Sequence, residues 1–171
     1  MINEIFNKVL WFVGLVLLQV LFLNKMTVAG IATPLPYIYL LIIFNRNTPR
    51  WVLLLVGFIL GLTMDSYTNL SGIHAAACVV LAMVQPVYMD LFIPRELQDE
   101  RSLAPSVNTL RWMGFLKYVF ICVLTHHFIL IMLVFFSVKD VMGIVMRVVG
   151  CTLLTMLVIS IFAMLGARKR N

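Results

Sequence analysis

Five ionisable side chains fall inside apolar stretches of this sequence, where a charge is costly and needs a partner or a function. They are Asp65, His74, His126, His127 and Arg147. Because a helix rises about 1.5 Å per residue, a helix that starts at Trp51 carries Asp65 roughly 21 Å into a hydrocarbon core that is about 30 Å thick. The same counting brings the other four residues to a similar level. The pattern therefore predicts a belt of polar side chains at one depth.

Several kinds of chemistry compete for this belt. A metal site is disfavoured because His126 and His127 are adjacent and point about 100° apart on a helix. We therefore expect neither a metal nor a cofactor. A proton pathway needs groups stacked along the membrane normal, whereas these share one level. The favoured interpretation is a structural cluster that fixes helix positions, with Asp65 paired to Arg147. A water-filled or partner-lined outer cavity is the other interpretation.

Small residues define a packing face next to this belt. Gly57, Gly61 and Asp65 are spaced by four residues and share one side of a helix. Such small-xxx-small patterns let membrane helices approach closely. Gly72 then precedes an alanine-rich segment, so these four residues are the predicted packing or partner face. Gln19, near the middle of the first apolar stretch, is expected to form hydrogen bonds between helices.

The composition shows which elements must position these residues. Of 171 residues, 63% are hydrophobic and 12% are charged, whereas soluble domains are roughly 45–50% apolar and about 25% charged. This excludes soluble enzymes, secreted disulfide modules and disordered proteins. We predict an all-α fold, a single transmembrane domain over residues 1–171 with six spanning helices. The expected spans are residues 5–23, 28–44, 51–65, 72–90, 113–136 and 141–165.

The distribution of basic residues predicts the orientation. The net charge of +6 comes from 13 basic and 7 acidic residues, and basic residues gather in cytoplasmic loops. Ten of the 13 fall on one side of the predicted topology: Lys8, Arg46, Arg50, Arg95, Arg101, Arg111, Lys117, Arg168, Lys169 and Arg170. Both termini are therefore expected in the cytoplasm, and the excess of positive charge is not read as a nucleic-acid signal.

The motif around Asp65 resembles a known family. The run from Gly57 through Gly61 to Asp65, followed by a polar turn, Gly72 and an alanine-rich helix, is similar to the signature of the MreD family of bacterial rod shape-determining membrane proteins. The sequence Leu-Leu-Gln ending at Gln19 matches the same pattern, as do prolines at the start of the second segment, the chain length and the basic tail. The motif covers about a quarter of the chain.

This resemblance implies a function and partners. MreD-like proteins are non-enzymatic components of the cell-elongation complex in the bacterial cytoplasmic (inner) membrane. They act with MreC and, indirectly, with MreB and with the elongation transpeptidase and glycosyltransferase that build peptidoglycan. Their fold is similar to that of the substrate-binding subunits of energy-coupling-factor transporters. A second hypothesis is therefore a binding subunit of a vitamin-type transporter, with a pocket formed by Tyr37, Tyr67 and the histidines.

Overall fold

The chain forms a bundle of helices in its computed structural model, which describes residues 2–27, 32–97, 103–136 and 140–168. Within this part, five helices are long and apolar enough to cross a membrane. They are α1 (Ile2–Leu21), α3 (Arg50–Thr68), α4 (Ile73–Phe92), α5 (Val107–Phe135) and α6 (Val141–Arg168). The predicted all-helical, multi-pass class is confirmed.

The second predicted span, residues 28–44, is not a continuous helix. Residues 28–31 lie outside the described part, and the rest contains only a 3-10 turn, η2 (Pro36–Ile38), followed by the single α-helical turn α2 (Tyr39–Ile42). The prolines explain this correction. Pro34 and Pro36 lack an N–H, and each disfavours helical geometry in the residue before it; Leu35, for example, has φ −122° and ψ 62°.

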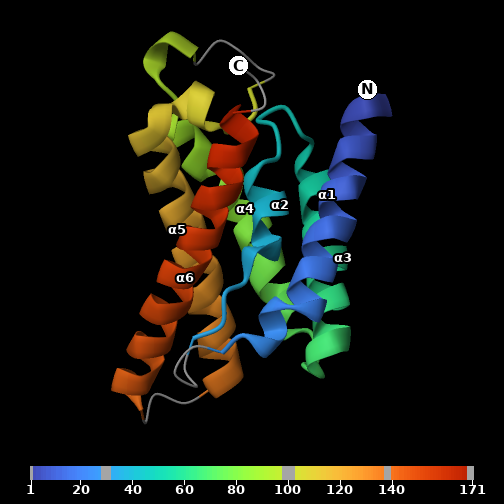
Figure 1. Cartoon of the computed structure of the whole chain (residues 1–171), viewed down its shortest axis with the longest axis vertical. Coiled ribbons are helices and arrows are strands. Elements are labelled where there is room, and N and C mark those ends of the chain that lie inside the picture. Colours follow the sequence, from blue (N-terminus) through green and yellow to red (C-terminus); the bar gives the residue numbers. More distant parts are fainter. Residues whose placement is uncertain (1, 28–31, 98–102, 137–139, 169–171) are drawn as a thin grey trace.

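This interrupted stretch, which we call the central segment (residues 32–46), runs through the core of the bundle. Figure 1 shows the segment rising between the end of α1 and the start of α3. Helices α3, α4, α5 and α6 pack in chain order, and the central segment contacts α1, α3, α4 and α6. Tyr37, Ile38 and Ile42 are each 0% exposed. The apolar centre of the molecule is therefore built around a segment that is mostly not helical.

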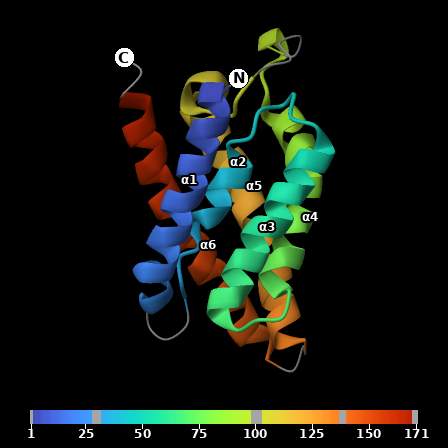
Figure 2. The same cartoon turned by 90° about the vertical axis from the view of Figure 1, so that its right-hand side faces the viewer.

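The two ends of the bundle carry different loops. The start of α1 and the end of α6 lie at one end, together with the α2–α3 loop, the end of α4 and the start of α5 (Figures 1 and 2). The ends of α3 and α5 and the starts of α4 and α6 lie at the other end. The long helices α1, α3, α4, α5 and α6 thus each run from one end of the bundle to the other. Several residues of the predicted charge pattern fall outside the described part: Arg101, Lys139, Lys169 and Arg170.

Local signals set the helix boundaries. Asn69, the residue after α3, adopts the left-handed conformation with φ 55°, and Gly72 precedes α4 with φ +83°. α5 begins earlier than predicted because the Ser106 side chain accepts a hydrogen bond from the N–H of Thr109 and caps the first turn. Arg111, with φ 57°, interrupts α5 immediately after that turn.

Candidate functional site: a buried polar network

The backbone of the central segment needs hydrogen-bond partners that a helix would have supplied internally. Within a bilayer, non-helical backbone is tolerated only where protein or a water-filled cavity satisfies its polar groups. Four buried side chains, each from a different long helix, meet this need. They are Gln19 of α1, Gln85 of α4, Tyr118 of α5 and Thr155 of α6.

Two of these side chains hold the first half of the segment. The amide nitrogen of Gln19 donates to the carbonyl of Pro34 at 3.1 Å and to Asn24 Oδ1 at 2.8 Å. The N–H of Leu35 donates to the hydroxyl of Thr155 at 2.9 Å. Both backbone groups belong to the proline-rich stretch, where no helical partner exists. Gln19 was expected to form hydrogen bonds between helices, and its amide instead bonds to the non-helical backbone at Pro34.

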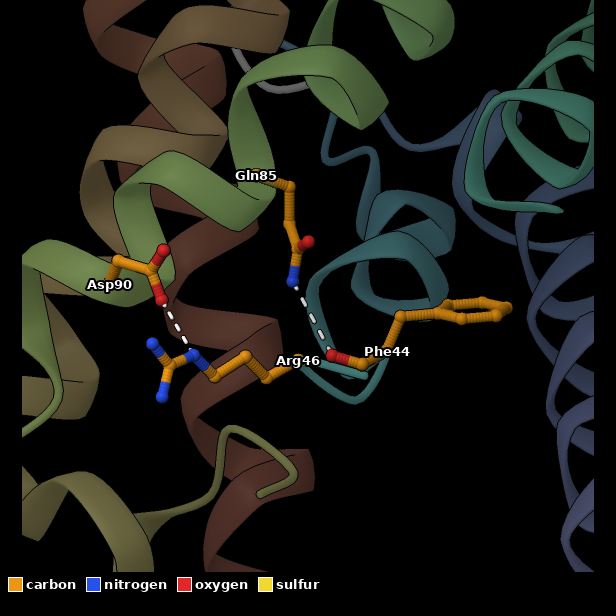
Figure 3. A network of polar contacts seen from close by, with 4 residues as sticks. All are labelled: Phe44, Arg46, Gln85 and Asp90. Atoms are coloured by element: carbon orange, nitrogen blue, oxygen red, sulfur yellow. Dashed lines mark hydrogen bonds and ion pairs between the residues drawn. The ribbon is translucent and has the colours of Figure 1, made fainter. Parts of the chain in front are cut away.

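The second half of the segment is held by α4 and α5. Tyr118 donates its hydroxyl proton to the carbonyl of Ile42 at 2.9 Å and accepts from the Gln85 amide at 2.8 Å. Gln85 also reaches the carbonyl of Phe44 at 3.4 Å. Figure 3 shows this contact.

The same end of the segment carries an ion pair. The Nε of Arg46 lies 2.8 Å from the Asp90 carboxylate, as Figure 3 shows, and the N–H of Arg46 donates to the carbonyl of Leu103 at 2.9 Å. Asp90 is about half exposed. These contacts tie the loop after α2 to the last turns of α4 and to the chain that precedes α5.

Two of the predicted histidines meet on the hydroxyl of Tyr37. This oxygen lies 2.7 Å from Nδ1 of His74 and 3.1 Å from Nε2 of His126. A hydroxyl carries one proton, so it donates to one ring and accepts an N–H from the other. The Sγ atom of Cys78 lies 3.8 Å from the same His126 nitrogen. α4 and α5 are thereby joined through the central segment.

The third histidine occupies a separate branch of the network. Nδ1 of His127 lies 2.8 Å from the carbonyl of Val123, which only accepts, so this nitrogen carries the proton. Nε2 is then an acceptor, and the Thr155 hydroxyl lies 3.3 Å from it. Since Thr155 already accepts from Leu35, its own proton is directed at His127. The donors and acceptors of Leu35, Thr155, His127 and Val123 are thus matched along this branch.

Asp65 serves the start of α4. Its two carboxylate oxygens accept hydrogen bonds from the N–H groups of His74 and Ala75, each at 2.9 Å. These amides belong to the first turn of a helix, which lacks internal acceptors and favours negative charge. Asp65 is 5% exposed. A buried acid is therefore compensated by backbone donors.

The expected ion pair between Asp65 and Arg147 is not formed, and this hypothesis is wrong. Arg147 is partly exposed and lies over the ring of Phe135, with its guanidinium carbon 5.1 Å from the ring centroid. Counting residues placed both groups at similar depth. However, it could not give the rotation of α6 about its axis, nor the backbone donors beside Asp65.

Gly57 and Gly61 lie against α4. A Cβ atom added to Gly61 would fall 2.5 Å from the N atom of Ala75 and 2.6 Å from the carbonyl oxygen of His74, which is too close for any side chain. One added to Gly57 would fall 3.1 Å from the carbonyl oxygen of Cys78. Gly72 has open space around it and is needed for its positive φ instead. The face thus packs within the chain, between α3 and α4.

The polar side chains of this network bond to backbone groups and to one another. Among the described residues, no group of three His, Cys, Asp or Glu side chains is arranged to hold a metal ion. Nδ1 of His126, Oε1 of Gln19 and Oγ1 of Thr152 are buried without a hydrogen-bond partner.

Sequence reasoning missed part of this network. The sequence predicts Tyr37 only as a pocket residue, and Gln85, Tyr118 and Thr155 are not among the predicted site residues. The available signal was the same as for Gln19, an uncharged polar group within an apolar run.

The chain matches no protein-family model, no curated protein and no solved structure. The resemblance to the MreD family and the expected likeness to transporter subunits accordingly remain predictions.

Proposed function

We propose that this chain is a non-enzymatic, multi-pass membrane scaffold of the bacterial cell-elongation complex, acting as MreD-family proteins do. In this role it helps to maintain rod shape by organising peptidoglycan synthesis together with MreC. Its links to MreB and to the elongation transpeptidase and glycosyltransferase are indirect. We further propose that it resides in the cytoplasmic membrane with both termini in the cytoplasm.

The observation that carries this proposal is the joint between α3 and α4. The residues behind the family resemblance, from Gly57 to Gly72, form one structural unit in which Gly61 contacts the backbone of α4 and Asp65 caps it. Motif residues that shape a rigid joint suit a protein whose task is to hold other proteins in position.

A scaffold role also agrees with the use of the buried polar groups. His127, Thr155 and Tyr118 are engaged in holding the central segment and its neighbours. An enzyme or a transporter subunit needs polar groups directed at a substrate. Here His127, a predicted candidate for chemistry, bonds within the fold together with Thr155 and Tyr118, which favours a positioning function.

The proposal is tested by depleting the protein in its native cell while cell length, cell width and lysis are followed. We expect the rods to round up and lyse, and a plasmid copy of the gene to restore their shape. Supplementing the medium with vitamins should not restore the shape of the depleted cells or prevent their lysis. Cells that keep their shape but require a vitamin would instead support the transporter-subunit hypothesis and overturn the scaffold proposal.

A further inference from the structure

An apolar groove runs between α1 and α3, close to the end of the bundle that holds the α2–α3 loop. Its volume is about 400 Å³, within the range of roughly 300–1,000 Å³ typical of small-molecule sites. We call it the α1–α3 groove, and its main lining residues are Lys8, Phe12, Phe44, Val52, Val56 and Ile59. It does not include the polar network.

One end of the groove is positively charged. The ammonium of Lys8 lies 4.4 Å from the centroid of the Phe44 ring, so the side chain bends over the groove floor. Thr48, from the α2–α3 loop, lines the same end, and the exposed Arg50 begins α3 nearby. A lysine at a membrane interface buries its stem and keeps its ammonium at the level of the headgroups. The groove therefore has a positive charge at the Lys8 end and apolar side chains along the rest of its length.

The occupant must be thinner than a helix. α1 and α3 contact each other, and packed helices have axes about 8–10 Å apart. A transmembrane helix from a partner has a diameter of about 10–12 Å with its side chains, so it does not enter between them. An acyl chain is narrower. From Val52 to Ile59 the groove follows α3 for about 10 Å.

We propose that the α1–α3 groove binds one acyl chain of an anionic glycerophospholipid, whose phosphate lies against Lys8. Charge complementarity favours an anionic over a zwitterionic lipid, because each basic residue near the surface favours anionic lipid by about fivefold in affinity. Binding there fills the space between α1 and the rest of the bundle. The inference does not depend on the proposed scaffold function.

The test uses the whole protein in phosphatidylcholine vesicles that contain a few per cent of phosphatidylglycerol with a photoactivatable acyl chain. After illumination, the crosslinked positions are mapped by mass spectrometry. We expect the crosslinks to concentrate at Phe12, Val52 and Val56, and not at Leu55, which is 50% exposed on α3 outside the groove. Unlabelled phosphatidylglycerol should compete about fivefold better than phosphatidylcholine.

Matched variants separate the two parts of the proposal. Lys8→Gln should abolish the preference for phosphatidylglycerol, whereas Lys25→Gln, at an exposed position near the other end of α1, should leave it unchanged. Val56→Trp should reduce crosslinking at Phe12 several-fold, and Leu55→Trp should not. If Val56→Trp fails to accumulate, the effect of Lys8→Gln on the preference for phosphatidylglycerol still tests the proposal.

Two results would overturn the proposal. Equal crosslinking at Leu55 and Val56 would mean that lipid contacts this surface without a site. Equal competition by the two lipids in the unmodified protein would mean that Lys8 does not select the headgroup.

Discussion

The carboxylate of Asp65, near the end of α3, accepts a hydrogen bond from the backbone N–H of His74 in the first turn of α4. Ala75 donates to the other oxygen. This contact replaces the ion pair that the sequence suggested. It turns Asp65 into a helix cap that acts between two elements.

Replacing Asp65 should destabilise the protein without involving Arg147. Asp65→Ala leaves two buried N–H groups unsatisfied and should lower the free energy of unfolding by about 2 kcal/mol. Asp65→Asn keeps one acceptor oxygen and should lower the free energy of unfolding by less. Arg147→Ala, which removes a partly exposed contact with Phe135, should cost about 0.5 kcal/mol. Denaturation in detergent micelles measures each value.

The double variant provides the control for this interpretation. Because Asp65 and Arg147 do not contact one another, their effects should add within about 0.5 kcal/mol. A coupling energy above about 1 kcal/mol would restore the ion-pair hypothesis.

The glycines differ sharply in the space around them, which predicts different tolerance to substitution. Gly61→Leu should lower the free energy of unfolding by about 1–3 kcal/mol, because even a Cβ meets the backbone of Ala75. Less of this variant should accumulate in the membrane. Gly14→Leu, on α1 with nothing within 4 Å of an added Cβ, should accumulate normally. Immunoblots of membranes and melting curves in detergent test this pair. Normal melting of Gly61→Leu would refute the close approach of α3 and α4.

The hydroxyl of Tyr118 should contribute to stability separately from its buried ring. Tyr118→Phe keeps the ring but leaves the carbonyl of Ile42 without its partner, which should cost about 1–3 kcal/mol. Tyr67, which is 58% exposed, offers a matched control, and Tyr67→Phe should change stability by less than about 0.5 kcal/mol. Similar melting temperatures for both variants would mean that Tyr118 does not hold the central segment.

The proposed orientation is tested by single cysteines introduced at Asn69 and at Gln98. An impermeant thiol reagent applied to intact cells should label the cysteine at position 69 and spare the one at position 98. The native cysteines, Cys78, Cys122 and Cys151, are buried and contribute little background. Labelling at position 98 would reverse the orientation.

The sequence predicted the helical class and the positions of the five long helices because composition and apolar length carry that information. The boundaries of α3 and α4 fall within three residues of the expected spans. These features depend on local sequence and on the thickness of a bilayer.

The interruption at Pro34 and Pro36 was not predicted, although its cause is local. Prolines near the start of a spanning helix are tolerated, so their presence alone did not indicate that the helix would be reduced to two short turns. The partners of the central segment depend on how α4, α5 and α6 are rotated about their axes. The rotation of a helix about its axis cannot be derived from a single sequence. The structure is therefore needed to show the roles of Gln85, Tyr118 and Thr155.

Buried side chains replace helical hydrogen bonds along the central segment, and the amide of Leu35 reports on this replacement most directly. Hydrogen exchange of this amide, measured by NMR in micelles, should be as slow as that of Leu60 inside α3. Thr155→Val, which removes the acceptor of the Leu35 N–H, should speed its exchange by at least about fivefold. Thr63→Val, which removes a hydroxyl bonded only to its own helix, should leave it unchanged. Leu35 exchange that is fast in the unmodified protein, or indifferent to Thr155→Val, would contradict the claim.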